Sequence, residues 1–271
     1  TAAMDRAVAA LRICGDKLRR RDVWLTRNVA TEACRRASNG AEFVERVFAE
    51  TGIALDVISP GEEARLAVLG CQSLIDSEGP PALVFDIGGG STELILVTRG
   101  PRGEAVIQGW TSVPWGVVSL TETEPTDLSE SQRAAAYTRM RARVSDHLAS
   151  FRANVERVAP GPLQLLGTSG TITTLASVDM GLAGYDRRLV DGCMVTSAAM
   201  RAISADLAAK SPAERALQPC IGHDRADLVV AGCAILEAIL DAWPAETIRV
   251  ADRGIREGIL RTLIARDGGR G

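Results

Sequence analysis

The chain has 271 residues, of which 46% are hydrophobic and 24% charged, an ordinary globular composition with enough apolar material for a sizeable core. Its formal net charge of −3 gives no bulk attraction for nucleic acid or for an anionic membrane, so we expect neither as a partner, and any anion-binding site must be local. No apolar run approaches the roughly 20 residues of a membrane-spanning helix, and the first residues lack the pattern of a signal peptide, so we expect a cytoplasmic protein.

Six cysteines are scattered along the chain, and none belongs to a C-x-x-C pair. This spacing argues against a zinc site or a disulfide framework and favours reduced thiols that are mostly buried. The cysteines are Cys14, Cys34, Cys71, Cys193, Cys220 and Cys233.

Hydrophobic periodicity predicts the elements of the chain in order. In the first part we expect helices over 4–21, 30–37, 42–50 and 62–75, and strands over 23–26 and 55–59. Strands then follow over 83–87, 92–98, 104–112, 163–166 and 247–251. A polar, turn-like stretch over 121–129 precedes helices over 130–158, from 171, and over 197–210, 212–217, 225–241 and 255–265. This alternation of strands and helices predicts an α/β fold.

The most specific motif is an acidic residue, Asp86, that ends an apolar run and is followed by Gly88, Gly89, Gly90, Ser91 and then Glu93. Triple glycine between two β-rich runs predicts a tight hairpin. Glycine N–H groups can approach an oxyanion without a Cβ in the way, and two nearby carboxylates suit Mg²⁺. The alternative is a plain glycine-rich hairpin with two solvated acids, which the flanking Asp, Ser, Thr and Glu make the weaker interpretation.

A second loop joins a strand to a helix and consists of Gly167, Thr168, Ser169, Gly170 and Thr171. The first turn of a helix has unsatisfied N–H groups and a partial positive charge, so such a loop is suited to phosphate. The alternative is that Ser169 or Thr171 merely caps the helix. The absence of a lysine after the second glycine excludes a P-loop.

A third motif places Glu62, Glu63 and Arg65 after Pro60 and Gly61 at the start of a helix. Acidic residues at the start of a helix interact favourably with the helix dipole, and this purely structural role is the simpler interpretation. In the functional interpretation, one carboxylate orients or deprotonates water for attack on phosphorus, and Arg65 holds phosphate.

Weaker signals lie elsewhere in the chain. Arg27 sits at a strand–helix junction and fits an anion contact or a solvated surface position. Arg225 and Asp227 open a helix, where a cap or an ion pair is the simpler interpretation. Two runs of arginine are candidates for a surface that binds a long polyanion, although charge runs usually face solvent. They are Arg19, Arg20 and Arg21, and Arg35 and Arg36.

These motifs together, in this order, resemble the exopolyphosphatase / guanosine pentaphosphate phosphohydrolase family, a branch of the actin, sugar-kinase and Hsp70 superfold. The segments that carry the resemblance are 26–33, 58–65, 85–93, 167–172, 225–227 and 254–258. The resemblance implies that Glu63 activates the attacking water, that Asp86 and Glu93 hold Mg²⁺, and that both loops grip phosphates. It assigns supporting anion contacts to Arg65 and Arg27.

The same resemblance implies two ribonuclease-H-like domains with the site in the cleft between them, one formed by 1–60 plus 256–271 and the other by 61–255. The resemblance is to the short form of the family, which does not have the extra C-terminal helical domain of longer relatives. Family members normally open with a strand and an Asp-x-Gly-Ser/Thr-Asn type phosphate loop. No such segment occurs here, so we expect that residues precede Thr1 in the full protein.

The resulting prediction is a Mg²⁺-dependent hydrolase that releases terminal phosphate from polyphosphate or the 5′-phosphate of guanosine pentaphosphate. The alternatives are an ATP-dependent kinase of the same superfold and a non-catalytic polyphosphate or nucleotide sensor. The sequence does not rank the two substrates and leaves the oligomeric state open, a homodimer being the base-rate expectation.

Overall fold

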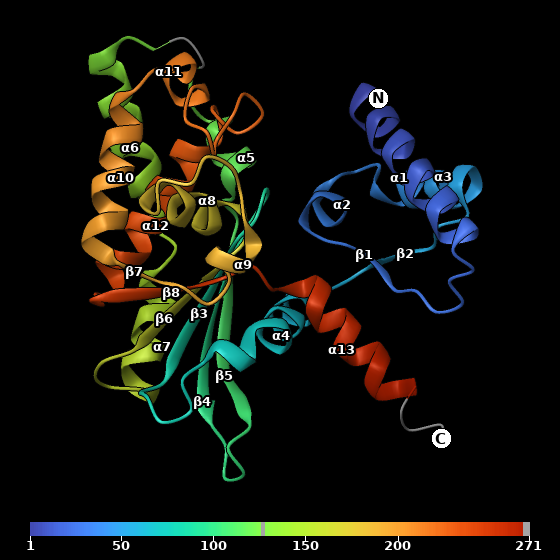
Figure 1. Ribbon diagram of the computed structural model, residues 1–271, viewed down its shortest axis with the longest axis horizontal. Coiled ribbons are helices and arrows are strands. Elements are labelled where there is room, and N and C mark those ends of the chain that lie inside the picture. The colour runs from blue at the N-terminus through green and yellow to red at the C-terminus, as the bar shows by residue number, and fades with distance from the viewer. Residues whose placement is uncertain (126–127, 268–271) are drawn as a thin grey trace. The chain divides into compact units, whose positions relative to one another are not determined.

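The computed structural model describes residues 1–125 and 128–267 (Figure 1). The chain divides into two compact units: unit 1 is Thr1–Glu63 with Ile259–Gly271, and unit 2 is Ala64–Gly258. The expected domain boundaries, 60/61 and 255/256, each lie 3 residues from these divisions. Residues 126–127 of the expected turn and 268–271 of the expected first domain lie outside the described residues. Among the helices of the described ranges, none has the length and hydropathy needed to cross a membrane.

Unit 1 contains a short parallel sheet with helices around it. In chain order its elements are α1 (Ala2–Arg20), β1 (Asn28–Ala30), α2 (Glu32–Arg36), α3 (Gly40–Thr51) and β2 (Leu55–Val57). Strands β1 and β2 pair in parallel, with Val29 opposite Asp56. A small core of Val8, Val47 and Ile53 holds α1 and α3 together.

The strand expected over 23–26 is wrong. The described chain has no regular secondary structure there, and Trp24 is 74% exposed. The strand forms a few residues later, at β1, where a partner strand is available. The apolar run from Val23 to Leu25 has β propensity, but propensity alone does not make a strand without cross-strand packing.

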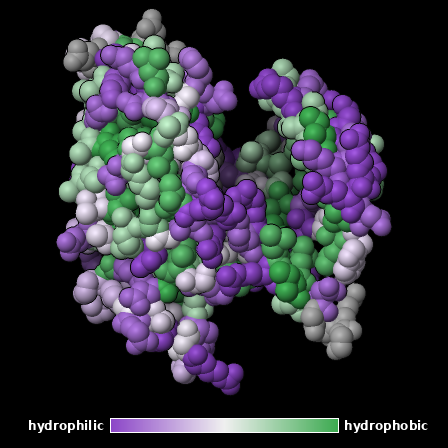
Figure 2. Space-filling model, viewed as in Figure 1, coloured by the Kyte–Doolittle hydropathy of each residue, from purple (hydrophilic) through white to green (hydrophobic). Residues whose placement is uncertain are grey.

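Unit 2 is built on a six-stranded mixed sheet. Its strands are β3 (Ala82–Ile87), β4 (Thr92–Arg99), β5 (Ala105–Val113), β6 (Gln164–Thr168), β7 (Met194–Thr196) and β8 (Thr247–Ala251), in the spatial order β5-β4-β3-β6-β8-β7. The central strands β3, β6 and β8 run parallel, and the other pairings are antiparallel. The tip of the β4–β5 hairpin, residues 101–104, is exposed, and its surface in Figure 2 is hydrophilic.

Alternation along the strands sorts the core of unit 2 into two faces. Leu83, Phe85 and Ile87 of β3 belong to the large core beneath most of the helices. Ala82 and Val84 belong to a smaller core on the opposite face, with Ala64 and other residues of α4 (Pro60–Cys71). Because side chains alternate along a strand, Asp86 shares the face of Ala82 and Val84.

Helices cover the sheet of unit 2 (Figure 1). In chain order the remaining ones are η1 (Gln72–Leu74), α5 (Val117–Thr121), α6 (Glu130–Ser145), α7 (Ala149–Val158), α8 (Gly170–Asp179), α9 (Arg187–Val190), α10 (Ser197–Ala209), α11 (Pro212–Ala216) and α12 (Val229–Ala242). The single helix expected over 130–158 is therefore wrong, because α6 and α7 are separate. The N–H groups of His147 and Leu148 bond three residues back, which tightens the turn and ends α6 without proline or glycine.

Two glycines allow close contact between α4 and α13 (Ile255–Asp267) in unit 2. A Cβ added to Gly70 would lie 2.0 Å from the carbonyl oxygen of Gly254, and one added to Gly258 would lie 2.0 Å from that of Leu66. Neither position has room for a side chain. Gly258 in the segment 254–258 therefore serves helix packing.

Candidate active site

The triple-glycine loop of unit 2 is the tight hairpin that the sequence predicts. The N–H of Gly88 donates to the carbonyl oxygen of Ser91 at 3.0 Å, and β3 and β4 continue from there as an antiparallel pair. In that register Asp86 lies directly opposite Glu93. Directly opposite residues project from the same face of a sheet, so the hairpin brings the two carboxylates to one face.

Helix α5 binds the carbonyl side of this loop. The N–H groups of Val117 and Val118 donate to the carbonyl oxygens of Gly88 and Gly89 at 2.9 and 2.8 Å. Gly116 permits this approach, since a Cβ there would lie 2.4 Å from the carbonyl carbon of Gly89. Within the described ranges, no acceptor is recorded for the N–H groups of Gly89 and Gly90. With its carbonyls occupied, the loop has N–H groups left for an anion, as an oxyanion cradle requires.

Glu93 is buried and fixed by two hydroxyl groups. Ser91 Oγ donates to Glu93 Oε1 at 2.7 Å, and Ser112 Oγ donates to the same oxygen at 2.9 Å. Glu93 is 2% exposed. The hydroxyl of Ser91 thus orients a carboxylate, and the backbone of the loop is what can cradle phosphate.

Asp86 is a buried carboxylate whose recorded partner is a neutral group. Its Oδ1 accepts a short hydrogen bond from Ser169 Oγ, and no ion pair to it occurs among the described residues. Burial raises the pKa of Asp86, and the Ser169 bond offsets this only in part. Gly254 leaves space beside it, because a Cβ there would lie 4.0 Å from Asp86 Oδ2.

The second loop leaves β6 and enters α8. Thr168 pairs with Asp86 across β3 and β6, and its Oγ1 donates to the carbonyl oxygen of Arg253 at 2.6 Å. Ser169 has a φ of 77°, an unusual conformation for a residue with a side chain, and it makes no capping bond to α8. Its hydroxyl points to Asp86 instead, so the capping alternative for Ser169 is wrong. The strained residue joins the two loops.

Both loops line one cavity of about 280 Å³ within unit 2. Gly88 and Gly89 contribute from the first loop, and Ser169, Gly170 and Thr171 from the second. The 10-residue helix α8 begins at this cavity, so its first N–H groups and its dipole favour a bound anion.

Arg225 adds a positive charge to the same cavity. One guanidinium nitrogen donates to Thr174 Oγ1 at 2.9 Å, and a Cβ on Gly170 would lie 3.6 Å from that nitrogen. No carboxylate pairs with Arg225 among the described residues, so the ion pair considered from the sequence is not formed there. A guanidinium near the first turn of α8 is suited to an anion, and sequence reasoning did not assign Arg225 to this loop.

The carboxylates fit a magnesium ion in number and type. Asp86 and Glu93 offer hard oxygen ligands, and Mg²⁺ in proteins is commonly held by one or two carboxylates together with substrate phosphates. Across residues 1–125 and 128–267, no group of three or more His, Cys, Asp or Glu side chains is arranged to hold a metal by itself. A cation would also offset the burial of Asp86.

Unit 1 holds the remaining candidate, Glu63, at its boundary in α4. The side chain is buried, and its Oε2 accepts a hydrogen bond from Arg35 Nη1 at 2.8 Å. The same Arg35 nitrogen donates to the carbonyl oxygen of Ile58 at 2.8 Å, while the rest of the guanidinium binds Glu32. These hydrogen bonds raise the pKa of Arg35 against the effect of its partial burial. Arg35 therefore fixes the orientation of Glu63.

The neighbouring residues have different surroundings. Arg27 donates to Glu62 Oε1 at 2.9 Å and to Asp56 Oδ2 at 3.2 Å, so its guanidinium is ion-paired within unit 1 and only 17% of its side chain is exposed. Arg65 lies two residues after Glu63 on α4 and is exposed. Of the basic residues considered as a polyanion path, Arg35 is engaged with carboxylates and Arg36 is exposed.

These features define an α/β protein with two glycine-containing loops on one cavity, a pair of buried carboxylates beside them, and a third buried carboxylate held by arginine. The model of the Ppx/GppA phosphatase family matches residues 1–266, and the chain belongs to that family. Its fold is accordingly the actin-like two-domain α/β fold.

Known relatives are similar to this chain over most of its length. It is 28% identical to exopolyphosphatase 2 of Mycobacterium tuberculosis, over 88% of this chain and 74% of that protein. It is 30% identical to exopolyphosphatase 1 of Mycobacterium leprae, over 86% of this chain and 67% of that protein.

Solved structures agree with this assignment. An exopolyphosphatase from Cytophaga hutchinsonii superposes with a TM-score of 0.83 and 26% identity, covering 97% of this chain and 82% of that one. The Ppx/GppA family member of Aquifex aeolicus gives a TM-score of 0.75 and 28% identity, with the same coverage. The chain is thus a member of a family of phosphatases, which are hydrolases.

Proposed function

We propose that the protein hydrolyses phosphoanhydrides and releases the terminal phosphate of inorganic polyphosphate. The observation that carries the proposal is the shared cavity of unit 2, where both glycine-containing loops and Arg225 converge. A phosphate there meets free loop N–H groups, the start of α8 and a guanidinium. The names of the mycobacterial relatives support polyphosphate as the substrate.

Phosphoryl transfer needs positioning and charge neutralisation more than covalent help from the protein. When bound, Mg²⁺ would supply positive charge to the transferring phosphoryl group. Asp86 and Glu93 would provide its protein oxygens, and their hydroxyl partners, Ser169, Ser91 and Ser112, keep these carboxylates in place.

We further propose that Glu63 orients and deprotonates the attacking water. Its carboxylate is held by Arg35, and a fixed carboxylate is the kind of group that can accept a proton from a positioned water. Arg65 and Arg27 are proposed as supporting anion contacts, and Arg27 would need to exchange one of its two carboxylate partners to fill this role.

The decisive experiment measures phosphate release from long-chain polyphosphate and from guanosine pentaphosphate, side by side, with and without Mg²⁺, on the full-length protein. Release that requires Mg²⁺ and no acceptor molecule supports the hydrolase and excludes the kinase alternative. Saturable binding of both substrates without release would instead favour the sensor. Guanosine pentaphosphate presents the same anhydride as polyphosphate, so the ratio of the two rates assigns the preferred substrate. A cytoplasmic location and a homodimer stay predictions.

A further inference from the structure

The loop that leads from β8 into α13, residues 252–254, passes beside the carboxylates of unit 2. The carbonyl oxygen of Arg253 accepts a hydrogen bond from Thr168 Oγ1 at 2.6 Å. A Cβ on Gly254 would lie 3.4 Å from that hydroxyl and 4.0 Å from Asp86 Oδ2. Loop 252–254 therefore contacts the second glycine-containing loop directly and borders the metal-binding candidate.

Side chains from the segment around α9 hold both backbone groups of Asp252. Its N–H donates to Asp191 Oδ1 at 3.1 Å, and its carbonyl oxygen accepts from Arg187 Nη2 at 2.6 Å. The other oxygen of Asp191, Oδ2, accepts from Arg253 Nε at 2.7 Å. A surface loop ordinarily leaves many such groups to water, so these bonds fix the orientation of this peptide.

Glu257 extends the arrangement from the first turn of α13. Its Oε2 accepts from the N–H of Gly254 at 2.9 Å, and its Oε1 accepts from Arg187 Nη2 at 3.0 Å. Arg187 thus binds the loop twice, through the carbonyl group of Asp252 and through Glu257. Hydrogen bonds on both sides therefore keep loop 252–254 beside the carboxylates.

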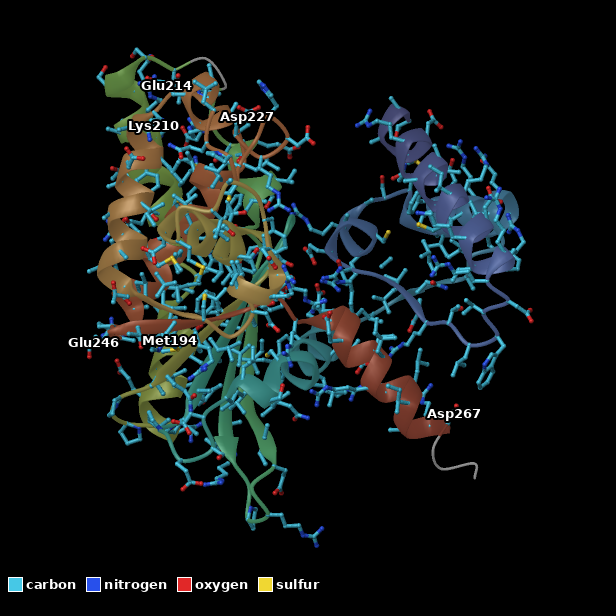
Figure 3. All side chains as sticks on the ribbon, viewed as in Figure 1. Met194, Lys210, Glu214, Asp227, Glu246 and Asp267 are labelled. Atoms are coloured by element: carbon cyan, nitrogen blue, oxygen red, sulfur yellow. The ribbon has the colours of Figure 1, made fainter. Side chains whose placement is uncertain are left out.

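The backbone that carries Asp191 is anchored on both sides. Val190 before it is fully buried, and the N–H of Gly192 after it donates to the carbonyl oxygen of Val250 at 2.8 Å. The chain then enters β7, where Met194, labelled in Figure 3, pairs with β8. The side chain of Asp191 is only 11% exposed. A side chain on such a fixed base can hold a neighbouring loop in one position.

We propose that Asp191 is a positioning residue for the second glycine-containing loop. It holds loop 252–254, which holds Thr168, so that Thr168 and the following Ser169 keep their places beside Asp86. Asp191 acts through these contacts and is not among the described residues that line the phosphate cavity. Its effect on rate rests on the proposed hydrolase function, whereas the structural coupling to Thr168 does not.

Hydrogen exchange of the backbone amides, measured on the full-length protein without metal or substrate, tests the coupling. Asp191→Ala removes both acceptors that hold loop 252–254. We expect exchange to become about tenfold faster over 252–256 and also over 165–172, because the second stretch loses a fixed partner for Thr168.

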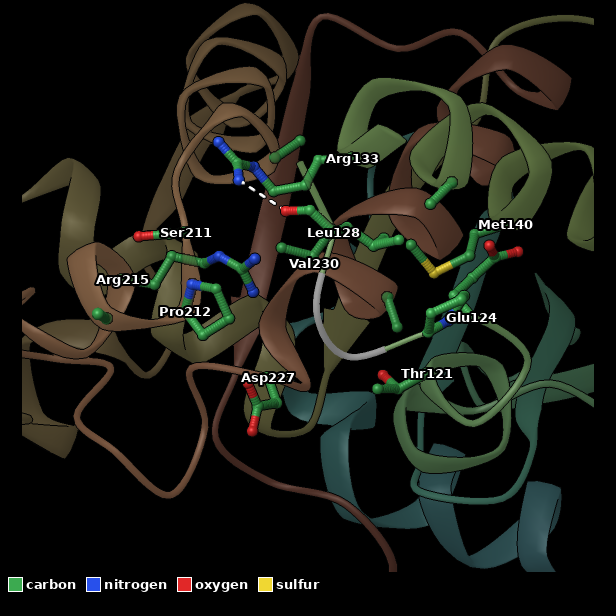
Figure 4. A pocket seen from close by; sticks show the side chains of 15 residues that line it. Thr121, Glu124, Leu128, Arg133, Met140, Ser211, Pro212, Arg215, Asp227 and Val230 are labelled. Carbon is green, nitrogen blue, oxygen red and sulfur yellow. Dashed lines mark hydrogen bonds between the residues drawn. The ribbon is translucent and has the colours of Figure 1, made fainter. Parts of the chain in front are cut away.

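Two controls separate positioning from general destabilisation. Arg188→Ala alters the same segment, but Arg188 is exposed and its recorded bonds are to Asp186. Met140→Ala truncates a buried side chain of α6 (Figure 4) and should lower the unfolding temperature. Neither should speed exchange over 165–172 relative to the rest of unit 2. Unchanged exchange over 165–172 in Asp191→Ala, or the same increase in Met140→Ala, would overturn the proposal.

Steady-state hydrolysis of polyphosphate tests whether the coupling affects the rate. Asp191→Ala and Thr168→Val should each lower kcat/KM by about tenfold, because displacing a binding group is costly even when the substitution is remote from the chemistry. The double variant should also lose about tenfold rather than about a hundredfold, since both residues act through one connection.

Native kcat/KM in Asp191→Ala, or an additive loss in the double variant, would contradict the role of Asp191. A native protein that releases no phosphate would refute the proposed function instead. The exchange measurements alone would then decide the coupling between Asp191 and Thr168.

Discussion

Two buried carboxylates in this protein have opposite electrostatic surroundings. Glu63 in unit 1 and Asp86 in unit 2 are each 6% exposed. Glu63 receives a guanidinium hydrogen bond from Arg35, whereas the recorded partner of Asp86 is the hydroxyl of Ser169. The first carboxylate therefore has a cation fixed within its own unit, and the second has none recorded among the described residues.

The difference indicates two kinds of chemical task. A carboxylate fixed by arginine is held in one orientation, which suits a group that must act on a single water molecule. A carboxylate buried without a cation has a raised pKa, and a divalent ion would remove that cost of burial. The following predictions test this division.

The largest expected effect is that of Glu63→Gln. The amide keeps the shape of the side chain but cannot accept a proton from water, so kcat should fall by roughly 10²–10⁴-fold. Glu42→Gln is the control and should keep native activity, because Glu42 is an exposed carboxylate of α3 in the same unit. Steady-state phosphate release measures both, and full activity in Glu63→Gln would refute its role.

Asp86→Asn should act on the metal requirement. Loss of one hard ligand should raise the Mg²⁺ concentration for half-maximal activity by about 10–100-fold, with a smaller change at saturating Mg²⁺. Asp146→Asn, which alters an exposed carboxylate in the turn between α6 and α7, provides the control. A Mg²⁺ titration curve that coincides with that of the native protein would show that Asp86 is not a ligand.

Arg35→Met should reduce both activity and stability. Without the guanidinium, Glu63 loses its fixed orientation, and kcat should fall by about tenfold. The free energy of unfolding should also fall by about 3 kcal/mol, because Glu32 and Glu63 lose their cation. Arg35→Lys keeps the charge without the planar fork, so it should recover stability more than activity. Native kcat in Arg35→Met would show that Arg35 does not position Glu63.

The smallest expected effect is a pH dependence of stability in the absence of metal. Because the pKa of Asp86 is raised, the folded protein retains this proton at pH values where the unfolded chain has released it. The free energy of unfolding should therefore fall as the pH rises from about the ordinary value of 3.8 through the raised pKa, whereas Asp86→Asn lacks this decrease.

Urea unfolding of both proteins in EDTA, at several pH values, measures the effect. The stability of the native protein relative to Asp86→Asn should decline toward neutral pH, and Mg²⁺ should reverse the decline. Parallel pH profiles would contradict the account of Asp86.

Local sequence signals predicted the parts of the site that depend on local backbone structure. Three glycines between two β-rich runs specify the hairpin, and its register then places Asp86 opposite Glu93. The Gly-Thr-Ser-Gly segment likewise predicted a strand, a loop and a helix, which are β6 and α8.

Long-range contacts were not predictable in this way. Arg35 reaches Glu63 across 28 positions, and Arg225 reaches Thr174 across 51, so neither pairing has a local signature. The turn between α6 and α7 also lacks proline or glycine, and the apolar run at 23–25 lacks a partner strand. In each case tertiary context decides the structure.

Calorimetric Mg²⁺ binding in the presence of a non-hydrolysable polyphosphate analogue tests the central comparison most directly. The native protein, Asp86→Asn and Glu63→Gln are measured under the same conditions. The account predicts that Glu63→Gln binds Mg²⁺ like the native protein, whereas Asp86→Asn binds it about tenfold more weakly or worse. Native-like Mg²⁺ binding in Asp86→Asn, or its loss in Glu63→Gln, would contradict the division of tasks between the two carboxylates.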